Sequence, residues 1–395
     1  MPSHPVIRLL PGHHKRARQG HPWVYSNEIA MDAAAKALPA GVLVRLIAAD
    51  GEALGLATFN PHCLVAARIL ARDPEATIDE AFLASRIAKA LELRTLLYRE
   101  PYYRLVHAEA DQLPGLVVDR YGDVLVCQLN TAGMERLGDA LAAALDGLLA
   151  PRAILFRNDS PARALEGLKS EVRWLKGALE GPVELVENGV RYLADLAGGQ
   201  KTGWFYDQRE NRAFVASLAR GRRAVDLYCY SGGFALAAAV AGAASVLAID
   251  GSEPALALAE AAARLNGVAA RLSFRRGQAF GEMERLAAAG ERFELVICDP
   301  PAFVKSKREL TQGAKGYRKL ARLAASLAAP EGFVFLASCS HNIETERFAE
   351  EVRRGLAQAG RTGRILRSAG AAPDHPVHPF LPESAYLKAM VLQLD

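Results

Sequence analysis

Apolar residues follow different spacings in different parts of the chain, and these changes divide the sequence into three regions. Up to about residue 71 the apolar runs are short and separated by Gly, Asp, Asn and Pro, which is typical of small β-domains. Residues 72–185 mix helical periodicity with a strand meander. From residue 186 strand-like and helix-like runs alternate, as in a doubly wound α/β sheet. We therefore predict three domains, at 1–71, 72–185 and 186–395.

The same patterns predict individual elements. In the first domain we expect strands over 5–10, 41–48, 53–59 and 64–70. In the second we expect helices over 78–98 and 134–149, and strands within 105–129, 153–157 and 183–196. In the third, strands are expected over 225–229, 246–249, 272–274, 295–298, 333–338, 364–367 and 386–394. Ser252 is the expected N-cap of a helix over 255–265, with Gly267 beyond its end.

The stretch 223–250 organises the third domain. An apolar strand carrying Asp226 leads into a Ser231-Gly232-Gly233 turn, and a helix-like run then leads to a second strand that ends at Asp250. Strand, glycine-rich turn, helix and a strand with an acid at its tip form the unit that binds an adenosine ribose in open α/β sheets. Tyr230 stands where a dinucleotide-binding motif has its first glycine, so we predict a cofactor without a pyrophosphate, S-adenosyl-L-methionine.

The segment from Leu227 to Ile249 contains no charged side chain, so hydropathy alone would allow a membrane helix there. Glycines at 232, 233 and 242 interrupt it, and acids stand near both of its ends. The N-terminus lacks the apolar core of a secretory signal. We therefore predict a cytoplasmic protein with no membrane partner.

Two further motifs follow later strands of the same domain. Asp299-Pro300-Pro301 comes after the fourth strand, and its prolines fix the backbone so that the Asp299 carboxylate can face a planar, amide-like edge. Cys339 closes the fifth strand between two serines, whereas a cysteine buried only for packing is usually flanked by apolar residues. A thiolate at that position could attack an electron-poor ring carbon.

Composition narrows the class of protein. The chain has 395 residues, 51% hydrophobic and 23% charged, with a net charge of +4, as in an ordinary globular protein. Its five cysteines form no CxxC pair, which argues against a zinc site or a disulfide framework. His107, Glu109 and Asp111 alternate along one strand, but a polar strand edge explains them better than metal binding does. We therefore predict no metal.

Two basic clusters are candidates for binding RNA. No acid precedes Glu28, and the cations there stand beside Trp23 and Tyr25, a combination that binds phosphates and stacks on bases. The second cluster follows the proline pair. Solvated surfaces are the alternative in both places. The predicted contacts are Lys15, Arg16 and Arg18, then Lys305, Lys307, Arg308, Lys315 and Arg318.

With these motifs in place, the sequence resembles the RlmI-like large-subunit rRNA methyltransferases, which make 5-methylcytosine with S-adenosylmethionine. The likeness spans nearly the whole chain. Besides the Ser-Gly-Gly turn, Asp299-Pro300-Pro301 and Ser338-Cys339-Ser340, it rests on the basic N-terminal stretch, which resembles a PUA domain, and on the strings at 109–122, 199–203 (Gly-Gln-Lys-Thr-Gly), 207–212 (Asp-Gln-Arg-Glu-Asn-Arg) and 374–377 (Asp-His-Pro-Val).

The resemblance implies a fold, a reaction and a set of residues. The third domain is expected to be a Rossmann-like class I methyltransferase with a mostly parallel seven-stranded sheet, behind a PUA-like domain and a mixed α+β domain. Cys339 is expected to attack C6 of a cytosine in 23S rRNA or a large-subunit assembly intermediate, while Asp299 binds the N3/N4 edge. The cofactor is expected to contact Phe205, Gln208, Asp226, Tyr230, Ser231, Gly232, Gly233, Asp250, Gly251, Ser252, Gln278, Asp299 and Pro300, and the RNA also Lys201, Arg209 and Arg212.

Two departures and two alternatives qualify this prediction. Gln278 stands where many relatives carry an acid near the adenine, and Ala302 stands where other 5-methylcytosine RNA enzymes have a second cysteine. An rRNA amino- or purine-methyltransferase could use Asp299-Pro300-Pro301 without a nucleophile, and Cys339 would then be dispensable. A non-catalytic rRNA-binding assembly factor is the second alternative. Whether the chain forms a homodimer is left open by the sequence.

Overall fold

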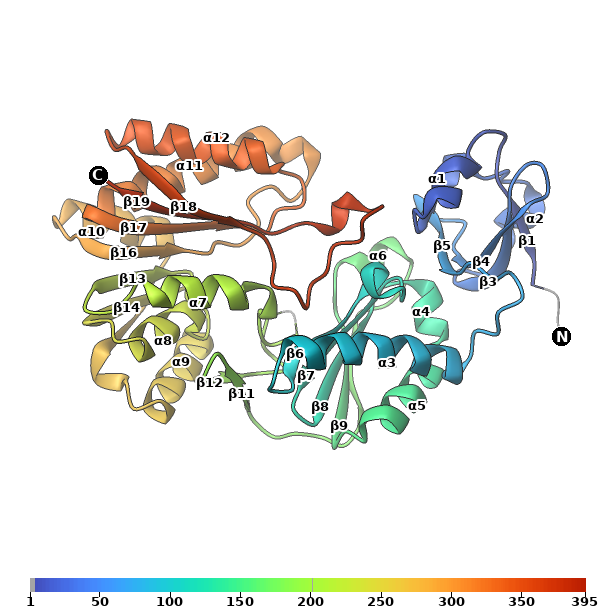
Figure 1. Ribbon diagram of the computed structural model, residues 1–395, viewed down its shortest axis with the longest axis horizontal. Helices are drawn as coiled ribbons and strands as arrows, with labels where there is room; N and C mark the ends of the chain where they lie inside the picture. Colours follow the sequence, from blue (N-terminus) through green and yellow to red (C-terminus); the bar gives the residue numbers. More distant parts are fainter. Residues whose placement is uncertain (1–3, 201) are drawn as a thin grey trace. The chain divides into compact units, whose positions relative to one another are not determined.

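The structure is a computed structural model that describes residues 4–200 and 202–395. It consists of two compact units. Unit 1 comprises Met1–Gly181, Leu196–Trp204 and Pro373–Ser384, and unit 2 comprises Pro182–Asp195, Phe205–Ala372 and Ala385–Asp395. Each unit therefore contains chain segments that are distant in the sequence (Figure 1).

Unit 1 begins with a five-stranded sheet in the order β1-β3-β4-β5-β2. The strands are β1 (Val6–Arg8), β2 (Trp23–Tyr25), β3 (Val42–Ile47), β4 (Ala53–Phe59) and β5 (Val65–Ala71), with the short helices α1 (His14–Gln19) and α2 (Ala33–Lys36). The four strands expected from the sequence are present. β2 was not predicted, because its three residues are too few to show an alternating pattern.

The remainder of unit 1 is a second five-stranded sheet in the order β10-β9-β8-β7-β6. Its elements are α3 (Glu80–Leu97), β6 (Tyr102–His107), β7 (Leu116–Tyr121), β8 (Val124–Leu129), α4 (Ala132–Arg136), α5 (Gly138–Leu149), β9 (Ala153–Asn158), α6 (Ala162–Leu165) and β10 (Glu171–Lys176). The helix predicted over 134–149 is divided at Leu137, next to Gly138, a residue with low helix propensity.

Buried ion pairs hold the second sheet of unit 1 together. Arg94 of α3 is fully buried and binds both carboxylate oxygens of Asp111 at 2.6 and 2.8 Å. Arg104 of β6 binds Asp119 of β7 at 2.8 and 2.9 Å. The nearby Glu109 accepts a hydrogen bond from Trp23 Nε1 at 2.8 Å. Asp111 and Glu109, two of the three residues weighed as metal ligands, thus have protein partners.

Unit 2 contains a seven-stranded sheet in the order β15-β14-β13-β16-β17-β19-β18. Its strands are β13 (Arg223–Leu227), β14 (Ser245–Asp250), β15 (Leu272–Arg276), β16 (Phe293–Cys298), β17 (Ala328–Ser338), β18 (Gly363–Ala369) and β19 (Lys388–Leu394). In this sheet β19 runs antiparallel to both of its neighbours, and the other pairs are parallel. The prediction of a mostly parallel seven-stranded sheet is confirmed.

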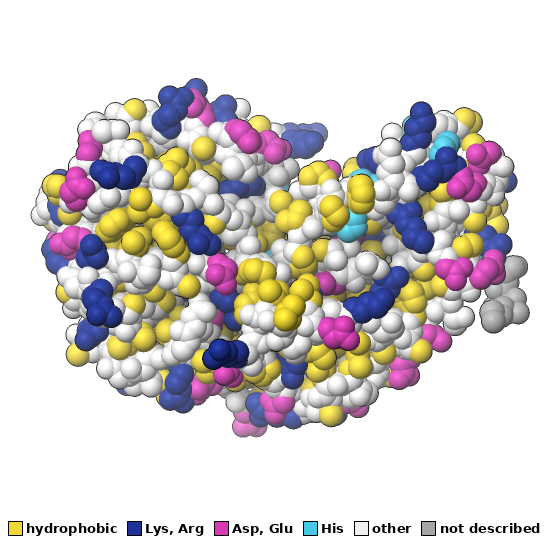
Figure 2. All heavy atoms as spheres, in the orientation of Figure 1, with side chains coloured by type: hydrophobic (Ala, Val, Ile, Leu, Met, Phe, Trp, Pro, Cys, Tyr) yellow, Lys and Arg dark blue, Asp and Glu magenta, His cyan; other side chains and the backbone are white. Residues whose placement is uncertain are grey.

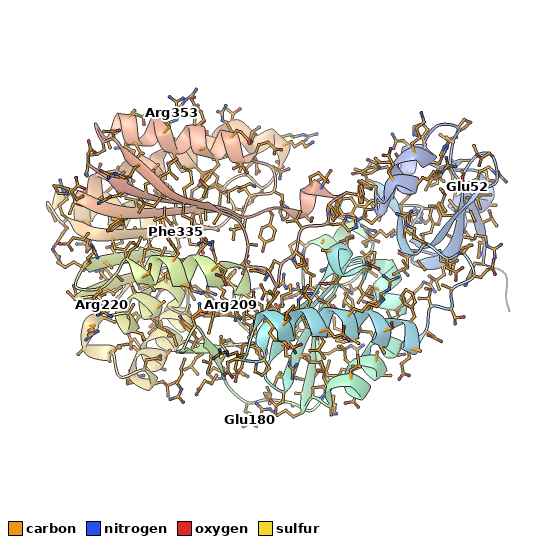
Figure 3. All side chains as sticks on the ribbon, in the orientation of Figure 1. Glu52, Glu180, Arg209, Arg220, Phe335 and Arg353 are labelled. Atoms are coloured by element: carbon orange, nitrogen blue, oxygen red, sulfur yellow. The ribbon has the colours of Figure 1, made fainter. Side chains whose placement is uncertain are left out.

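Helices cover both faces of this sheet, as Figure 1 shows. One layer holds α7 (Arg209–Ser217), α8 (Gly233–Val240) and α9 (Glu253–Leu265), near the hairpin of β11 (Val183–Glu187) and β12 (Val190–Ala194). The other holds α10 (Ala279–Ala288), α11 (Leu310–Leu327) and α12 (Thr345–Gln358). Phe335 of β17, labelled in Figure 3, packs on Phe234 of α8 with ring centroids 4.8 Å apart. The predicted N-cap is also present, because Ser252 accepts a hydrogen bond from Ala255 N.

The charge-free stretch 227–249 forms the end of β13, a turn, the eight-residue helix α8 and most of β14. Across residues 4–200 and 202–395, no helix combines the length and apolar character that crossing a membrane requires. On the visible face of unit 2, cationic and acidic side chains are interspersed over α12 (Figure 2). Ion pairs such as Arg353–Glu350 and Arg354–Glu350 account for part of this mixture.

Candidate active site

The predicted site residues of unit 2 gather at one edge of its sheet. Strands β14, β13, β16 and β17 are neighbours and run parallel, so their carboxyl ends meet at the same edge. Asp226 lies within β13, Asp250 ends β14, Asp299 follows β16 and Cys339 follows β17. The sheet topology therefore brings together four groups that span more than 110 residues of sequence.

The turn after β13 has an unusual backbone. Tyr228 and Tyr230 have φ of +66° and +50°, in the left-handed region that disfavours most L-residues, and Gly232 has φ of +84°. A Cβ at Gly232 would lie 2.9 Å from Ala259 Cβ of α9, so only glycine fits there. Tyr230 N donates to Asp250 Oδ2 at 2.9 Å, which ties the turn to the tip of β14.

Asp226 and Ser231 are buried with incomplete hydrogen bonding. Asp226 Oδ2 accepts from Ala235 N at 2.9 Å, but neither Asp226 Oδ1 nor Ser231 Oγ has a partner within the described part of the chain. Burial raises the pKa of Asp226 well above its usual range, and the nearby Asp299 and Asp250 act in the same direction. Buried polar atoms are almost always hydrogen-bonded in native proteins, so these two atoms are candidates for hydrogen bonds to a polar ligand.

Asp250 is held by backbone donors on both of its oxygens. Besides Tyr230 N, Ser252 N donates to Asp250 Oδ1 at 2.8 Å. A carboxylate has about four acceptor positions, so the two oxygens keep capacity for hydroxyl donors. Gln278 begins α10 and is exposed, and its Nε2 lies 3.4 Å from the position that a Cβ on Gly251 would occupy. Gly251, Ser252 and Gln278 thus lie together beside Asp250.

Asp299 is oriented by a chain of amides. Gln208 Nε2 donates to Asp299 Oδ1 at 2.9 Å, and Asn211 Nδ2 donates to Gln208 Oε1 at 2.7 Å. Asn211 Nδ2 also lies 3.3 Å from the carbonyl oxygen of Gly370. Because Asn211 occupies the oxygen of the Gln208 amide, the amino end of that amide is directed toward Asp299. The predicted Phe205 contacts the turn as well, edge-on to Tyr230 with ring centroids 5.5 Å apart.

Cys339 lies beside the proline pair. Its Sγ is 3.9 Å from the carbonyl oxygen of Pro300. Of the five cysteines, all within the described residues, Cys339 is the one that is not buried. Burial raises the pKa of Cys229 and of Cys298 well above the usual thiol value, which makes them poor nucleophiles. Cys339 is therefore the cysteine of this chain whose setting suits chemistry.

The residue after the cysteine fixes the loop. Ser340 Oγ lies 2.7 Å from the Tyr317 hydroxyl and accepts from Val304 N at 3.1 Å. Lys388 of β19 donates from Nζ to the carbonyl oxygen of Ser340 at 2.7 Å. Sequence reasoning missed Lys388. The available signal was a lysine at the start of the otherwise apolar strand Lys388–Leu394, where only Gln393 is also polar.

Two arginines predicted to bind RNA have other partners, which corrects that prediction. Arg212 is buried and binds Glu187 at 2.7 and 2.9 Å, and it also donates to the Phe205 carbonyl oxygen at 2.7 Å. Arg209, labelled at the start of α7 in Figure 3, is buried and lies 3.6 Å from Glu187. Neither guanidinium is open to a phosphate, because both are enclosed around one buried carboxylate.

The other predicted RNA contacts divide by exposure. Lys15 is exposed, and so is Arg18, which pairs with Glu52 at the surface, whereas Arg16 is half-buried and pairs with Glu28. Arg16 also lies over the Tyr25 ring, 4.7 Å from its centroid. Arg318 pairs with Glu351 at 2.7 Å. Lys201 lies outside the described residues. The predicted contacts after the proline pair that remain exposed are Lys305, Lys307, Arg308 and Lys315.

The strand-end residues fit an adenosine cofactor bearing a polar amino-acid tail. Asp226 Oδ1 and Ser231 Oγ are available to polar groups of such a ligand, and the Asp250 carboxylate can accept from ribose hydroxyls. Gly232 allows the backbone to approach the ligand closely. The arrangement thus suits a cofactor beside a nucleophilic cysteine and an oriented carboxylate.

Comparisons with known proteins agree with this geometry. Residues 161–391 match the family model of S-adenosylmethionine-dependent methyltransferases, and residues 7–72 match a PUA-like domain. A protein of Shewanella denitrificans named ribosomal RNA large subunit methyltransferase I is 36% identical over 98% of this chain and 99% of its own length. A solved structure of a putative S-adenosylmethionine-dependent methyltransferase from Streptococcus mutans covers 98% of this chain and 100% of its own, with a TM-score of 0.83 and 20% identity. Another putative methyltransferase, solved as a complex with SAH, covers 98% of this chain and 99% of its own at the same TM-score and 19% identity.

Proposed function

Because the chain belongs to the family of S-adenosylmethionine-dependent ribosomal RNA large subunit methyltransferases I, we propose that it methylates C5 of a cytosine in 23S rRNA. The observation that carries the cytosine-5 assignment is the partly exposed Cys339 thiol, 3.9 Å from the carbonyl oxygen of Pro300. C5 of cytosine is a weak nucleophile unless another group first adds to C6. A cysteine beside the Asp-Pro-Pro turn would supply that group.

The proposed reaction uses the side chains in a defined order. The Cys339 thiolate forms a bond to C6, and the electron pair of the C5–C6 double bond becomes available at C5. S-adenosylmethionine, when bound, would supply an electrophilic methyl group for C5, with cleavage of its sulfonium–methyl bond and release of S-adenosylhomocysteine. A base then removes the proton from C5, the C5–C6 double bond re-forms, and the bond to Cys339 breaks to return the thiolate. Asp299, oriented by Gln208, would bind the N3/N4 edge of the ring.

The base must leave its stack to reach this site. The exposed cations after the proline pair, Lys305, Lys307, Arg308 and Lys315, support binding of the flanking phosphates, and the PUA-like domain with Lys15 and Tyr25 supports a second contact with RNA. We propose 23S rRNA or a large-subunit assembly intermediate as the substrate. A homodimer is compatible with this function, but the function does not require one.

The decisive experiment substitutes the nucleophile. With 23S rRNA and labelled cofactor, Cys339→Ala should lose methyl transfer by at least about a thousandfold while its affinity for S-adenosylmethionine stays within twofold, because the thiol is needed to activate C5. Cys63→Ala, which alters a buried cysteine of unit 1, is the matched control and should stay active. RNA containing 5-fluorocytosine should form a covalent adduct with the wild type, since fluorine at C5 cannot be removed as a proton.

The alternatives have distinct outcomes. An amino- or purine-methyltransferase would hold its target with Asp299-Pro300-Pro301 and need no nucleophile, so full activity of Cys339→Ala would favour it over the cytosine-5 reaction. A non-catalytic assembly factor would transfer no methyl group to any rRNA. Mapping 5-methylcytosine across rRNA from cells with and without the gene would identify the nucleotide.

A further inference from the structure

Lys388 is a buried lysine next to the proposed nucleophile. It begins β19, where its backbone pairs with Ser338 of β17, the residue that precedes Cys339. Its side chain is 7% exposed. Nζ donates to the carbonyl oxygen of Ser340 at 2.7 Å and to that of Tyr386 at 2.9 Å. Lys388 thus contacts the chain on both sides of Cys339, through its backbone at Ser338 and through its ammonium group at Ser340.

A lysine in this position is costly for the fold. Burial of an ammonium group costs free energy unless charged or strongly polar groups surround it, and lysine is among the residues least often buried. Burial lowers the pKa of Lys388, whereas the Glu344 carboxylate and the Cys339 thiolate oppose that effect. No carboxylate within the described residues forms a salt bridge with Lys388, and its two hydrogen bonds are to backbone carbonyls. An apolar side chain at position 388 would stabilise this mostly apolar strand more than a lysine does.

We propose that Lys388 is a positioning residue for methyl transfer, which favours the thiolate form of Cys339 and fixes the loop that carries it. This inference rests on the proposed function of Cys339 as the nucleophile. A cation beside a thiol stabilises the thiolate, the form that attacks C6. The hydrogen bond to Ser340 places the same cation at the backbone of the nucleophile, so one side chain supplies both charge and position.

Other titratable groups also face Cys339, and they determine the size of the effect. Asp299 and its proline pair follow the neighbouring strand β16, where the Pro300 carbonyl oxygen lies 3.9 Å from Cys339 Sγ, and Glu344 lies in the loop after β17 and raises the pKa of Lys388. Tyr317 of α11 binds Ser340, and its own pKa is raised chiefly by burial. His341, two residues beyond Cys339, stacks on Tyr386 with ring centroids 5.1 Å apart. Lys388 contributes a cation to this loop from β19 through its hydrogen bond to the Ser340 carbonyl oxygen.

The test measures the thiol directly, without RNA or cofactor. The full-length protein is alkylated with iodoacetamide across pH 5.5–10, and modification of Cys339 is followed by mass spectrometry. The wild type should reach half its maximal rate below pH 8.5, the ordinary thiol value, because the neighbouring cation favours the thiolate. Lys388→Met should raise that midpoint by about one pH unit, which is about a tenfold slower alkylation at pH 7.

Two further variants separate charge from structure. Lys388→Arg keeps a cation and should keep the midpoint within about half a unit, whereas Lys388→Gln keeps an N–H donor without charge and should raise the midpoint as Lys388→Met does. Lys319→Met is the matched control, because Lys319 pairs with Glu284 in the same unit, and its removal should not move the midpoint. A purely structural role predicts the opposite pattern, with Lys388→Gln behaving as the wild type.

The outcomes for the two proposals are distinct. A wild-type midpoint at or above pH 8.5, or a midpoint that is the same in the wild type and Lys388→Gln, overturns the role of Lys388 whatever Cys339 does. Full activity of Cys339→Ala overturns the proposed function, even where alkylation shows a thiolate stabilised by Lys388. Where both proposals hold, the kcat/KM of Lys388→Gln recovers toward the wild-type value as pH rises, because higher pH restores the thiolate.

Discussion

Buried and half-buried carboxylates in the two units have very different partners. In unit 1, Asp111 and Asp119 each receive two hydrogen bonds from an arginine, Arg94 and Arg104 respectively. In unit 2, Asp226 and Asp250 are held by backbone N–H groups, and no lysine or arginine of the described chain forms a salt bridge with either. A buried carboxylate paired with an arginine has its charge balanced within the fold, whereas one without a cationic partner remains available to a ligand.

The contrast depends on which sheet carries the carboxylate and is not a property of the two units themselves. Glu187 of β11 lies in unit 2 and is fully buried, yet Arg212 binds both of its oxygens. Glu187 belongs to the hairpin beside α7 and not to the seven-stranded sheet. Within unit 2, therefore, Glu187 of the hairpin is paired with an arginine, whereas Asp226 and Asp250 of the seven-stranded sheet form no salt bridge with a lysine or arginine among the described residues.

The largest expected effect is the loss of a paired arginine in unit 1. Arg94→Met should lower the free energy of unfolding of unit 1 by about 3–5 kcal/mol, because it leaves Asp111 buried without its cation. The three tryptophans, Trp23, Trp174 and Trp204, all belong to unit 1, so tryptophan fluorescence in urea reports its unfolding. Arg152→Met removes the exposed pair with Asp123 and should cost less than about 1 kcal/mol. Equal losses in the two variants would contradict this view of the buried pairs.

Asp226→Asn should increase the stability of the fold, in contrast to Arg94→Met, while it weakens cofactor binding. The amide cannot ionise, so it avoids the cost of burying a carboxyl whose pKa is raised, and unit 2 should become more stable by about 1 kcal/mol at neutral pH, as measured by hydrogen exchange of its peptides. Binding of S-adenosylmethionine should weaken by about 2–3 kcal/mol, because Asp226 Oδ1 no longer offers a charged acceptor. Calorimetry gives this second value. A variant that is less stable yet binds as tightly as the wild type would show that Asp226 serves the fold.

The stability gain of Asp226→Asn should depend on pH. Burial raises the pKa of Asp226 in the folded protein, so the folded form keeps a proton that the unfolded chain releases near pH 3.9. The wild type therefore loses stability relative to the variant as pH rises above about 4, until the folded carboxyl ionises as well. Below pH 4 the two proteins should be equally stable. A difference that grows toward acid pH would contradict the direction of the pKa shift.

A smaller effect is expected for the amides that orient Asp299. Gln208→Leu should lower kcat/KM about tenfold, or about 1.4 kcal/mol, because one hydrogen bond to the carboxylate is lost while the fold is kept. Asn211→Ala should have a weaker effect of the same sign, since the Gln208 amide could then rotate. Steady-state kinetics with rRNA measures both. A larger loss for Asn211→Ala than for Gln208→Leu would place the main role of Asn211 in folding.

The strand-end residues could be predicted from the sequence because each follows an apolar run and belongs to a local motif. Asp250, Asp299 and Cys339 are of this kind, and the sheet brings them to one edge as expected. Lys388 and Asn211 could not be predicted on the same basis. Lys388 binds the carbonyl oxygen of Ser340, which is 48 residues away in the sequence and is brought close only by the packed sheet. Asn211 binds the Gln208 side chain, and the conformation at the start of α7 decides whether the two side chains meet. Arg209 and Arg212 were predicted to be exposed and to bind RNA, because a charged segment next to a site is usually at the surface. The buried Glu187 that both arginines contact lies more than 20 residues earlier in the sequence, so local sequence could not identify it as their partner.

The smallest expected effect concerns Tyr230, whose backbone lies in the region that favours glycine. Tyr230→Gly removes left-handed strain of about 1–2 kcal/mol, but it loses the edge contact with Phe205 and adds freedom to the unfolded chain, each about 0.5–1 kcal/mol. These terms nearly cancel, so the stability of unit 2 should change by less than about 0.5 kcal/mol. Tyr230→Ala keeps the strain and loses the ring, so it should be about 1 kcal/mol less stable than Tyr230→Gly. Hydrogen exchange of the peptides spanning the turn measures the difference. Equal stability of Tyr230→Ala and Tyr230→Gly would show that the turn is not strained. The positive φ of Tyr230 would then not distinguish the turn of unit 2 from the arginine-paired sheet of unit 1.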